Sequence, residues 1–136
     1  MPDRFTSQER SRIMSRVKGQ HTKPEKVVRS LLHSMGYRFR LHVKDLPGKP
    51  DIVLSKYRKV IFVHGCFWHG HKNCSRAARP QTNADFWNKK LDSNIARDVN
   101  TQIQIAELGW QFLIVWQCEI KDVEKLRQRL THFLAM

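Results

Sequence analysis

The sequence predicts an α/β domain in which a mixed β-sheet is flanked by helices. Three observations favour this class: amphipathic helical segments near both ends of the chain, short strand-like segments between residues 37 and 63, and an apolar run at 110–117 that follows a long helical segment. The expected order of elements is α-β-β-β-α-β-α. The chain has 136 residues, a length that suits one compact core.

Residues 22–36 carry the clearest helix signal in the first part of the chain. Thr22 is placed to cap the helix, Glu25 three residues later can complete a capping box, and Gly36 ends the helix. The apolar residues fall on one side, so this helix should pack on the core; they are Val27, Val28, Leu31, Leu32 and Met35.

Residues 6–17 form a weaker helical segment that is rich in arginine. Its few apolar residues can pack on the body of the protein. Alternatively, the segment can lie on DNA as a basic arm, with Met14 and Val17 reaching the bases as apolar wedges. We therefore divide the chain into a basic N-terminal DNA-binding arm, residues 1–21, and a single domain, residues 22–136.

Three strands are expected next. Residues 37–43 alternate between apolar and polar side chains, which is typical of a half-buried strand. Residues 51–54 and 59–63 are two further strands, joined by a turn. If position 54 faces position 59 across this hairpin, then Asp51 and His64 project from the same side of the sheet.

A long helix is expected over residues 83–108, with a pause near 92–94 and a stop at Gly109. Apolar residues at helical spacing should supply much of its buried face; they are Leu91, Ile95, Val99, Ile103 and Ala106.

The apolar run at 110–117 is interpreted as a fully buried strand, and residues 122–134 as the last helix. If the strands at 59–63 and 110–117 are parallel neighbours, their carboxyl ends meet at one edge of the sheet. Cys66 would then lie near Cys118.

The charge distribution indicates a polyanionic partner. The formal net charge is +13, and residues 1–50 carry 12 lysines and arginines against 4 acidic residues, whereas residues 101–136 carry 4 of each. Basic side chains gain free energy by displacing the counterions of a nucleic acid, so we expect nucleic-acid binding; a merely basic surface is the alternative.

The chain shows no sign of a membrane or secretory destination. No apolar run approaches the length of a membrane span, and the N-terminus lacks the apolar core of a signal peptide. We therefore expect no membrane partner and a reducing cytosol. Three cysteines, an odd number, do not favour a disulfide framework.

Residues 64–74 combine histidines, cysteines, glycines and an aromatic pair in one loop. Cys66 and Cys74, with the distant Cys118 and one imidazole, would make a closed tetrahedral zinc site that pins this loop. Three buried free thiols are the alternative. Spacing cannot choose the fourth ligand among His64, His69 and His71.

Asp51 follows a proline at the start of a strand, where it can serve as an end-cap or turn residue. It should also lie beside His64 at the base of the same loop. A carboxylate is the ligand type that Mg²⁺ takes, and a divalent ion with a nearby histidine to move protons is a standard arrangement for phosphodiester hydrolysis.

Several motifs resemble those of the very-short-patch repair endonucleases. The resemblance runs from about residue 7 to the last helix, and the run from His64 to His69 is highly specific. The stretches that carry it are PGKPDIV at 47–53, VIFVHGCFWH at 60–69, FW at 86–87, ELGW at 107–110 and VWQCE at 115–119.

This resemblance implies a DNA mismatch endonuclease with the restriction-endonuclease-like core of the PD-(D/E)xK nucleases. Such enzymes nick one strand of duplex DNA, 5′ to the thymine of a T:G mismatch, which arises when 5-methylcytosine deaminates. The implied partners are duplex DNA containing a T:G mismatch and, as a family expectation, other mismatch-repair proteins. Because nicking one strand needs only a monomer, we expect a monomer in the bacterial cytoplasm, associated with the nucleoid.

The resemblance also implies roles for individual residues. Asp51 would be the ligand of the catalytic Mg²⁺, together with the main-chain carbonyl of Val63. His69 would be the base or water-orienting residue, supported by His64, with Glu25 close to this centre. The structural Zn²⁺ would be held by Cys66, His71, Cys74 and Cys118. The residues that enter the DNA stack would be Phe67, Trp68, Trp87, Met14 and Val17.

The aromatic pair in the loop also has an interpretation of its own. Phe67 and Trp68 lie between glycines, where both cannot easily be buried, so their flat rings can stack on exposed bases. A lid over the zinc loop is the alternative.

Two departures from the wider superfamily stand out. Phe62 and His64 occupy the positions where that superfamily has an acidic residue and a lysine, a departure that the very-short-patch family shares. Val63 stands where a threonine is expected, and a carbonyl ligand tolerates this change. Two rival functions remain: a zinc-stabilised DNA-binding module without catalysis, and a restriction-type nuclease that cuts both strands.

Overall fold

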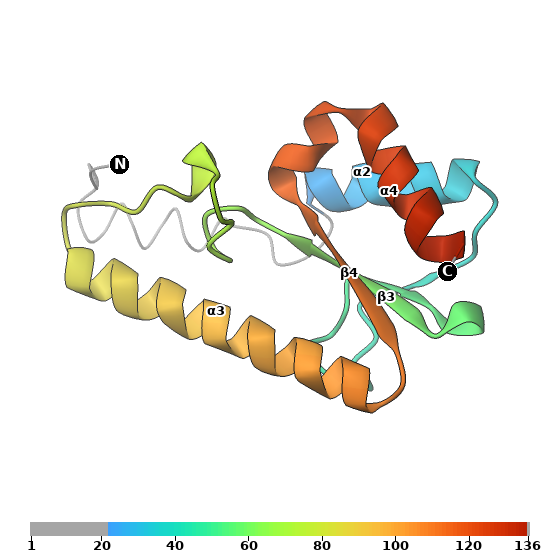
Figure 1. Ribbon diagram of the computed structural model, residues 1–136, viewed down its shortest axis with the longest axis horizontal. Helices are drawn as coiled ribbons and strands as arrows, with labels where there is room; N and C mark the ends of the chain where they lie inside the picture. The colour runs from blue at the N-terminus through green and yellow to red at the C-terminus, as the bar shows by residue number, and fades with distance from the viewer. Residues whose placement is uncertain (1–21, 136) are drawn as a thin grey trace.

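The computed structural model describes residues 22–135, drawn in colour in Figure 1. The predicted arm at 1–21, with its helix and with Met14 and Val17, lies outside the described residues. None of the described helices combines the length and the apolar character that crossing a membrane requires.

Within residues 22–135, four strands form one mixed sheet in the order β1-β2-β3-β4. Strand β2 (Ile52–Leu54) is antiparallel to β1 (Arg40–Leu41) and to β3 (Lys59–His64), whereas β3 is parallel to β4 (Gln111–Trp116). Short 3₁₀ turns in the described part of the chain are η1 (Ser55–Tyr57), η2 (Ser75–Ala77) and η3 (Gln117–Lys121). The predicted class, a mixed sheet flanked by helices, is confirmed.

Helices cover both faces of this sheet. Helices α2 (Lys23–Ser34) and α4 (Val123–Ala135) lie together on one face, and α3 (Ala84–Glu107) runs along the other (Figure 1). Because strand side chains alternate between faces, the sheet supplies two cores. The core under α2 and α4 includes Leu32, Ile52, Ile61, Val115 and Leu130, and the core under α3 includes Val53, Val60, Phe62 and Ile105.

Helix α2 begins and packs as its sequence predicts. The Thr22 hydroxyl accepts a hydrogen bond from the Glu25 amide at 3.4 Å, which satisfies one of the unpaired amides of the first turn. Val28 and Leu32 are fully buried. The Glu25 carboxylate, expected to complete the cap, instead accepts a hydrogen bond from Arg29 and faces His42.

The predicted hairpin register is confirmed. Leu54 pairs with Lys59 and Ile52 with Ile61, so position 51 lies opposite Phe62 just outside the paired segment. The parallel pairing of β3 with β4 runs to His64 and Trp116, and the loops that follow these two residues therefore leave the sheet at the same edge.

Two strands differ from their predicted form. The strand expected at 37–43 is reduced to Arg40–Leu41, because His42 adopts a left-handed backbone with a φ of 47° and ends it. Strand β4, expected to be fully buried, has only Val115 buried. The reason is that β4 is the last strand in the order of the described sheet, so it has a neighbour on one side only.

Helix α3 is continuous, and the pause expected near 92–94 is wrong. Val99 and Ile103, expected on its buried face, are each 51% exposed. The inward face follows a different row at helical spacing, which begins and ends with apolar side chains and is polar in the middle. This row comprises Trp87, Leu91, Asn94, Asp98, Thr101 and Ile105.

Candidate active site and metal centre

A cleft of about 740 Å³ lies at the carboxyl end of β3, bounded by α2, the β1–β2 connection, the loop after β3 and the polar middle of α3. Its lining combines acidic, imidazole and basic side chains. The acidic and imidazole groups are Glu25, His42, Asp51, His64, His69 and Asp98, and the basic groups are Lys49, Lys90 and Arg97. Asp51 and His64 thus project into one space, as the hairpin register predicts. Three cations thus lie beside three carboxylates, so the cleft offers contacts for an anionic substrate as well as ligands for a cation.

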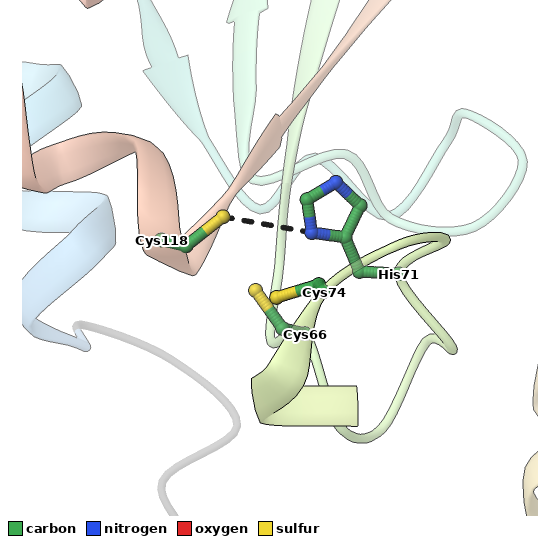
Figure 2. A group of neighbouring side chains, drawn as sticks. All are labelled: Cys66, His71, Cys74 and Cys118. Atoms are coloured by element: carbon green, nitrogen blue, oxygen red, sulfur yellow. Dashed lines mark hydrogen bonds between the residues drawn. The ribbon is translucent and has the colours of Figure 1, made fainter. Parts of the chain in front are cut away.

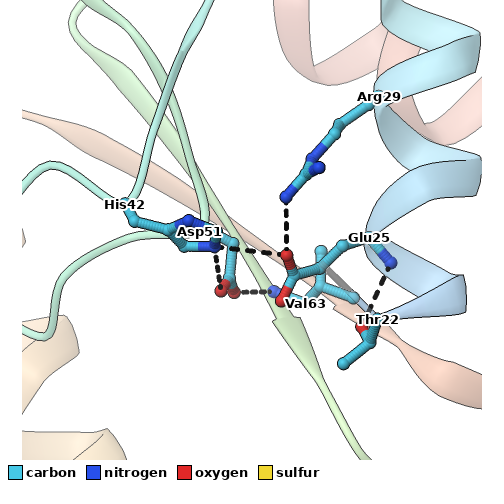
Figure 3. Close-up of polar contacts among 6 residues, drawn as sticks. All are labelled: Thr22, Glu25, Arg29, His42, Asp51 and Val63. Atoms are coloured by element: carbon cyan, nitrogen blue, oxygen red, sulfur yellow. Dashed lines mark hydrogen bonds and ion pairs between the residues drawn. The ribbon is translucent and has the colours of Figure 1, made fainter. Parts of the chain in front are cut away.

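Asp51 and Glu25 form the acidic part of the cleft (Figure 3). The Val63 amide donates a hydrogen bond to Asp51 Oδ2 at 2.6 Å. Val63 lies beyond the last residue pair of β2 and β3, so a side-chain carboxylate accepts this hydrogen bond in place of a strand carbonyl. Arg29 Nη2 donates to Glu25 Oε2 at 2.9 Å. His42 Nε2 lies 3.2 Å from Glu25 Oε2 and 3.7 Å from Asp51 Oδ1, between the two carboxylates.

The pKa of Asp51 is raised from 3.8 to about 7, mainly by burial; the hydrogen bond from Val63 opposes this shift, and the nearby negative charge of Glu25 adds to it. An anionic Asp51 is therefore costly unless a cation shares the site. Carboxylate oxygens are the ligands that Mg²⁺ prefers, so the two carboxylates fit a divalent ion.

A second group that lines the cleft consists of His69, Asp98 and His64. His69 Nδ1 lies 2.6 Å from Asp98 Oδ2, which orients the ring and leaves Nε2 for other partners. The His64 ring stacks on His69 with centroids 3.8 Å apart. Burial, followed by the charge of His69, lowers the pKa of His64 to about 4, so His64 is neutral near pH 7.

The loop after β3 forms a second cluster at the same sheet edge. Cys66, His71, Cys74 and Cys118 each offer a ligand atom, and all four atoms lie within 4.8 Å of one another. Figure 2 shows the three sulfur atoms and the His71 ring around one small space, with Cys118 Sγ 3.5 Å from His71 Nδ1. Cys66 is fully buried, and burial raises the pKa of its thiol to about 11.

This donor set fits zinc. Three sulfurs and one imidazole within tetrahedral reach are typical of closed, structural zinc sites. The cysteines are not joined by disulfides, so all three sulfurs can serve as ligands. His71 also stacks on Trp116 at 4.1 Å, which fixes its orientation, whereas His64 and His69 turn towards the cleft. Of the three histidines that spacing leaves open, only His71 joins the cysteines in this group.

The aromatic residues of the loop gather over the start of α3. Phe67, Trp68 and Trp87 form a cluster with ring centroids 5.1 to 6.0 Å apart, and Phe86 packs against Trp87. Phe67 and Trp68 are half-buried, but Trp87 is only 5% exposed. In this arrangement Trp87 supports the other rings, and it could enter a DNA stack only if the cluster opened.

The structure adds three residues that the sequence did not single out. His42 lies between the carboxylates, Asp98 holds His69, and Asn94 Nδ2 donates to the Trp68 carbonyl at 3.1 Å. Asp98 stands seven residues after Leu91 and seven before Ile105, both buried in the same row of α3. That spacing is the signal that could have placed Asp98 on the inward face.

Comparisons with known proteins point in one direction. Residues 2–76 match the family model for "DNA mismatch endonuclease Vsr". Over 134 residues the chain is 50% identical to "Type II nicking enzyme V.XorIIP" of Xanthomonas oryzae pv. oryzae, covering 98% of each chain. It is 42% identical to "Type II nicking enzyme V.NmeAIP" of Neisseria meningitidis, covering 98% of this chain and 95% of the relative. It is also 42% identical to "DNA mismatch endonuclease Vsr" of Escherichia coli K12, covering 93% and 80%.

Proposed function

The chain belongs to the DNA mismatch endonuclease Vsr family, and from this premise we propose that it nicks one strand of duplex DNA 5′ to the thymine of a T:G mismatch. Mg²⁺ is the catalytic ion, and Zn²⁺ holds the loop after β3. The observation that carries this proposal is the cleft itself, which brings Asp51 and the His69–Asp98 pair together among three basic side chains.

Asp51 and Glu25 bind the catalytic ion. When bound, Mg²⁺ supplies positive charge that stabilises the negative charge developing on the phosphodiester oxygens. The N–H and C=O groups of a strand residue point to the same side of the strand. The Val63 N–H donates a hydrogen bond to the Asp51 carboxylate, so the Val63 carbonyl points to the side on which Asp51 lies. This supports the predicted role of that carbonyl as a further ligand.

His69 acts as the general base. Asp98 accepts a hydrogen bond from Nδ1–H, which leaves the lone pair on Nε2 to take a proton from the attacking water. The neutral His64 ring stacked behind His69 keeps its plane fixed and adds no competing charge. Lys49, Lys90 and Arg97 hold the phosphate backbone in the cleft.

The zinc cluster and the aromatic cluster serve the recognition of the mismatch. Cys66, His71, Cys74 and Cys118 fix the loop that also carries His69 and the aromatic pair. Phe67 and Trp68 stack on bases unstacked at the weak mismatch, at a cost of a few kcal/mol per unstacked step. A rigid loop keeps this stacking in register with the cleft.

An Asp51→Ala variant tests this assignment. It should bind a T:G duplex with near wild-type affinity, measured by fluorescence anisotropy, and should fail to nick it in the presence of Mg²⁺. Lys49→Ala is the matched control for a general loss of DNA contact, since it should weaken binding and slow nicking together. Nicking that survives in Asp51→Ala would contradict the assigned role of Asp51.

Two other functions are separated by the same assays. A DNA-binding module without catalysis would bind the duplex and leave both strands intact. A restriction-type nuclease would cut both strands of matched DNA. The enzyme is proposed to act as a monomer on DNA of the bacterial nucleoid, and contact with other mismatch-repair proteins remains part of this proposal.

A further inference from the structure

His42 occupies an unexpected place in the cleft. Alternation along the predicted strand would put it beside Arg40 and Lys44, away from the core. Instead, a backbone φ of 47° turns the chain directly after β1, and the His42 side chain is only 12% exposed. A left-handed conformation is uncommon for a residue other than glycine, and such conformations cluster at functional sites.

The neighbours of His42 are the two carboxylates that fit a divalent ion. Its Nε2 atom lies 3.2 Å from Glu25 Oε2 and 3.7 Å from Asp51 Oδ1 (Figure 3). All three side chains offer ligand atoms within 4.8 Å of one another. An ion that binds its ligands at about 2.1 Å and at right angles holds adjacent ligand atoms about 3 Å apart. The spacing in the cleft is close to this value.

The three side chains are held by separate parts of the fold. Glu25 comes from the first turn of α2 and is kept in place by a hydrogen bond from Arg29. Asp51 precedes β2 and accepts a hydrogen bond from the Val63 amide, and His42 follows β1. The His42 amide also donates to the Asp51 carbonyl at 3.3 Å, which links the two backbones. The donor set of two carboxylates and one imidazole is therefore assembled by the fold before any ion binds.

We propose that His42 Nε2 is a third side-chain ligand of the divalent ion at Asp51 and Glu25, and that the centre therefore binds first-row transition ions more tightly than Mg²⁺. Imidazole is a favourable ligand for first-row transition ions, whereas Mg²⁺ prefers oxygen ligands and water. This inference rests on the proposed function only in naming the ion at Asp51 as the catalytic one.

Mn²⁺ is the appropriate probe. It accepts carboxylate ligands as Mg²⁺ does, and its electron paramagnetic resonance signal reports binding without DNA. The variant of choice is His42→Asn, because asparagine tolerates a left-handed backbone. His42→Gln is a second variant, and His132→Gln, which removes an exposed imidazole from α4, is the matched control. All proteins are compared with their zinc retained.

We expect the His42 variants to lose affinity for Mn²⁺ much more than for Mg²⁺. His42→Asn should weaken Mn²⁺ binding by about tenfold or more and Mg²⁺ binding by about twofold at most, because Mn²⁺ gains more from an imidazole ligand than Mg²⁺, which readily keeps a water molecule in its place. Pulsed resonance of bound Mn²⁺ should show the modulation of a coordinated ¹⁴N in the wild type and in His132→Gln. The modulation should be absent from both His42 variants.

Three results would overturn the proposal: unchanged Mn²⁺ affinity in the His42 variants, equal losses for Mn²⁺ and Mg²⁺, or ¹⁴N modulation that persists without His42. Equal losses would mean that His42 only pairs with the carboxylates. If His42→Asn is unstable by thermal unfolding, His42→Gln supplies the same comparison. Nicking is measured separately. A wild-type protein that binds Mn²⁺ through His42 but cuts no T:G duplex would contradict the proposed function, while His42 would still be a metal ligand.

Discussion

Replacing Asp51 by asparagine should stabilise the folded protein while removing its activity. The Asp51 side chain is 16% exposed and lies beside Glu25, and burial raises its pKa from 3.8 to about 7. Asparagine is nearly isosteric, keeps an oxygen for the Val63 amide and carries no charge. The variant therefore avoids the free-energy cost of holding an anion in the cleft when no metal ion is bound.

The size of the expected stabilisation follows from the pKa shift of Asp51. A pKa that is higher in the folded state than in the unfolded state means that folding binds a proton between these two values, so stability falls as pH rises through that window. The shift of about three units corresponds to about 4 kcal/mol, an upper limit because the cleft is open to solvent. The difference between Asp51→Asn and the wild type should thus be near zero at pH 4 and reach its maximum above pH 7.

Urea unfolding from pH 4 to pH 8.5 measures this difference. The buffers should lack Mg²⁺ but contain no chelator, so that the zinc proposed at Cys66, His71, Cys74 and Cys118 is retained. His64 has a pKa lowered to about 4 and contributes the opposite pH dependence, but it is present in both proteins and cancels in the comparison. Adding Mg²⁺ at pH 8 should stabilise the wild type and leave the variant unchanged. Equal stability of the two proteins at pH 8 would show that the Asp51 carboxylate does not destabilise the folded protein.

Three further predictions concern the histidine pair, the loop and the zinc cluster. Asp98→Asn should slow nicking about a hundredfold or more with little change in DNA affinity. The control Asp92→Asn, at an exposed position, should change neither the nicking rate nor the DNA affinity. A nicking rate of Asp98→Asn near that of the wild type would contradict the orienting role. Gly70 has a φ of +62°, and an added Cβ would lie 2.5 Å from a side chain of α3, so Gly70→Ala should lower the free energy of unfolding by about 1–3 kcal/mol. Gly36 also has a positive φ, but an added Cβ there would meet no atom within 4 Å, so Gly36→Ala measures the backbone strain without a clash. An equal loss of unfolding free energy in the two variants would argue against the clash at Gly70. Cys118→Ser should leave the purified protein deficient in zinc and lower its melting temperature, and full zinc content by elemental analysis would rule out Cys118 as a ligand.

The parts of this structure that could be predicted are those in which local pattern and geometry agree. The hairpin register followed from the length of the turn between β2 and β3. A slip of β3 by one residue would turn Val60 to the other face of the sheet. The approach of Cys118 to Cys66 followed from the parallel strands that precede them. Both predictions depend on the backbone alone.

The missing parts depend on single side chains that break the local pattern. His42 looked like an outward residue of a strand, because nothing in its neighbours signals the left-handed turn that directs it into the cleft. Asp98 was passed over because hydrophobic periodicity counts apolar residues, and the inward row of α3 is polar where it meets the loop. The same bias assigned Val99 and Ile103 to the core although both are half exposed. Functional groups interrupt the apolar face that pattern analysis relies on.

The most direct test of the account is a strand-resolved nicking assay. Duplexes that differ only in one T:G or T:A pair, labelled differently on each strand, are incubated with the zinc-loaded protein and Mg²⁺. A single break, 5′ to the mismatched thymine, is expected in the T:G duplex, and no break is expected in the matched duplex. Cutting of both strands, or equal cutting of matched and mismatched DNA, would contradict the proposed function.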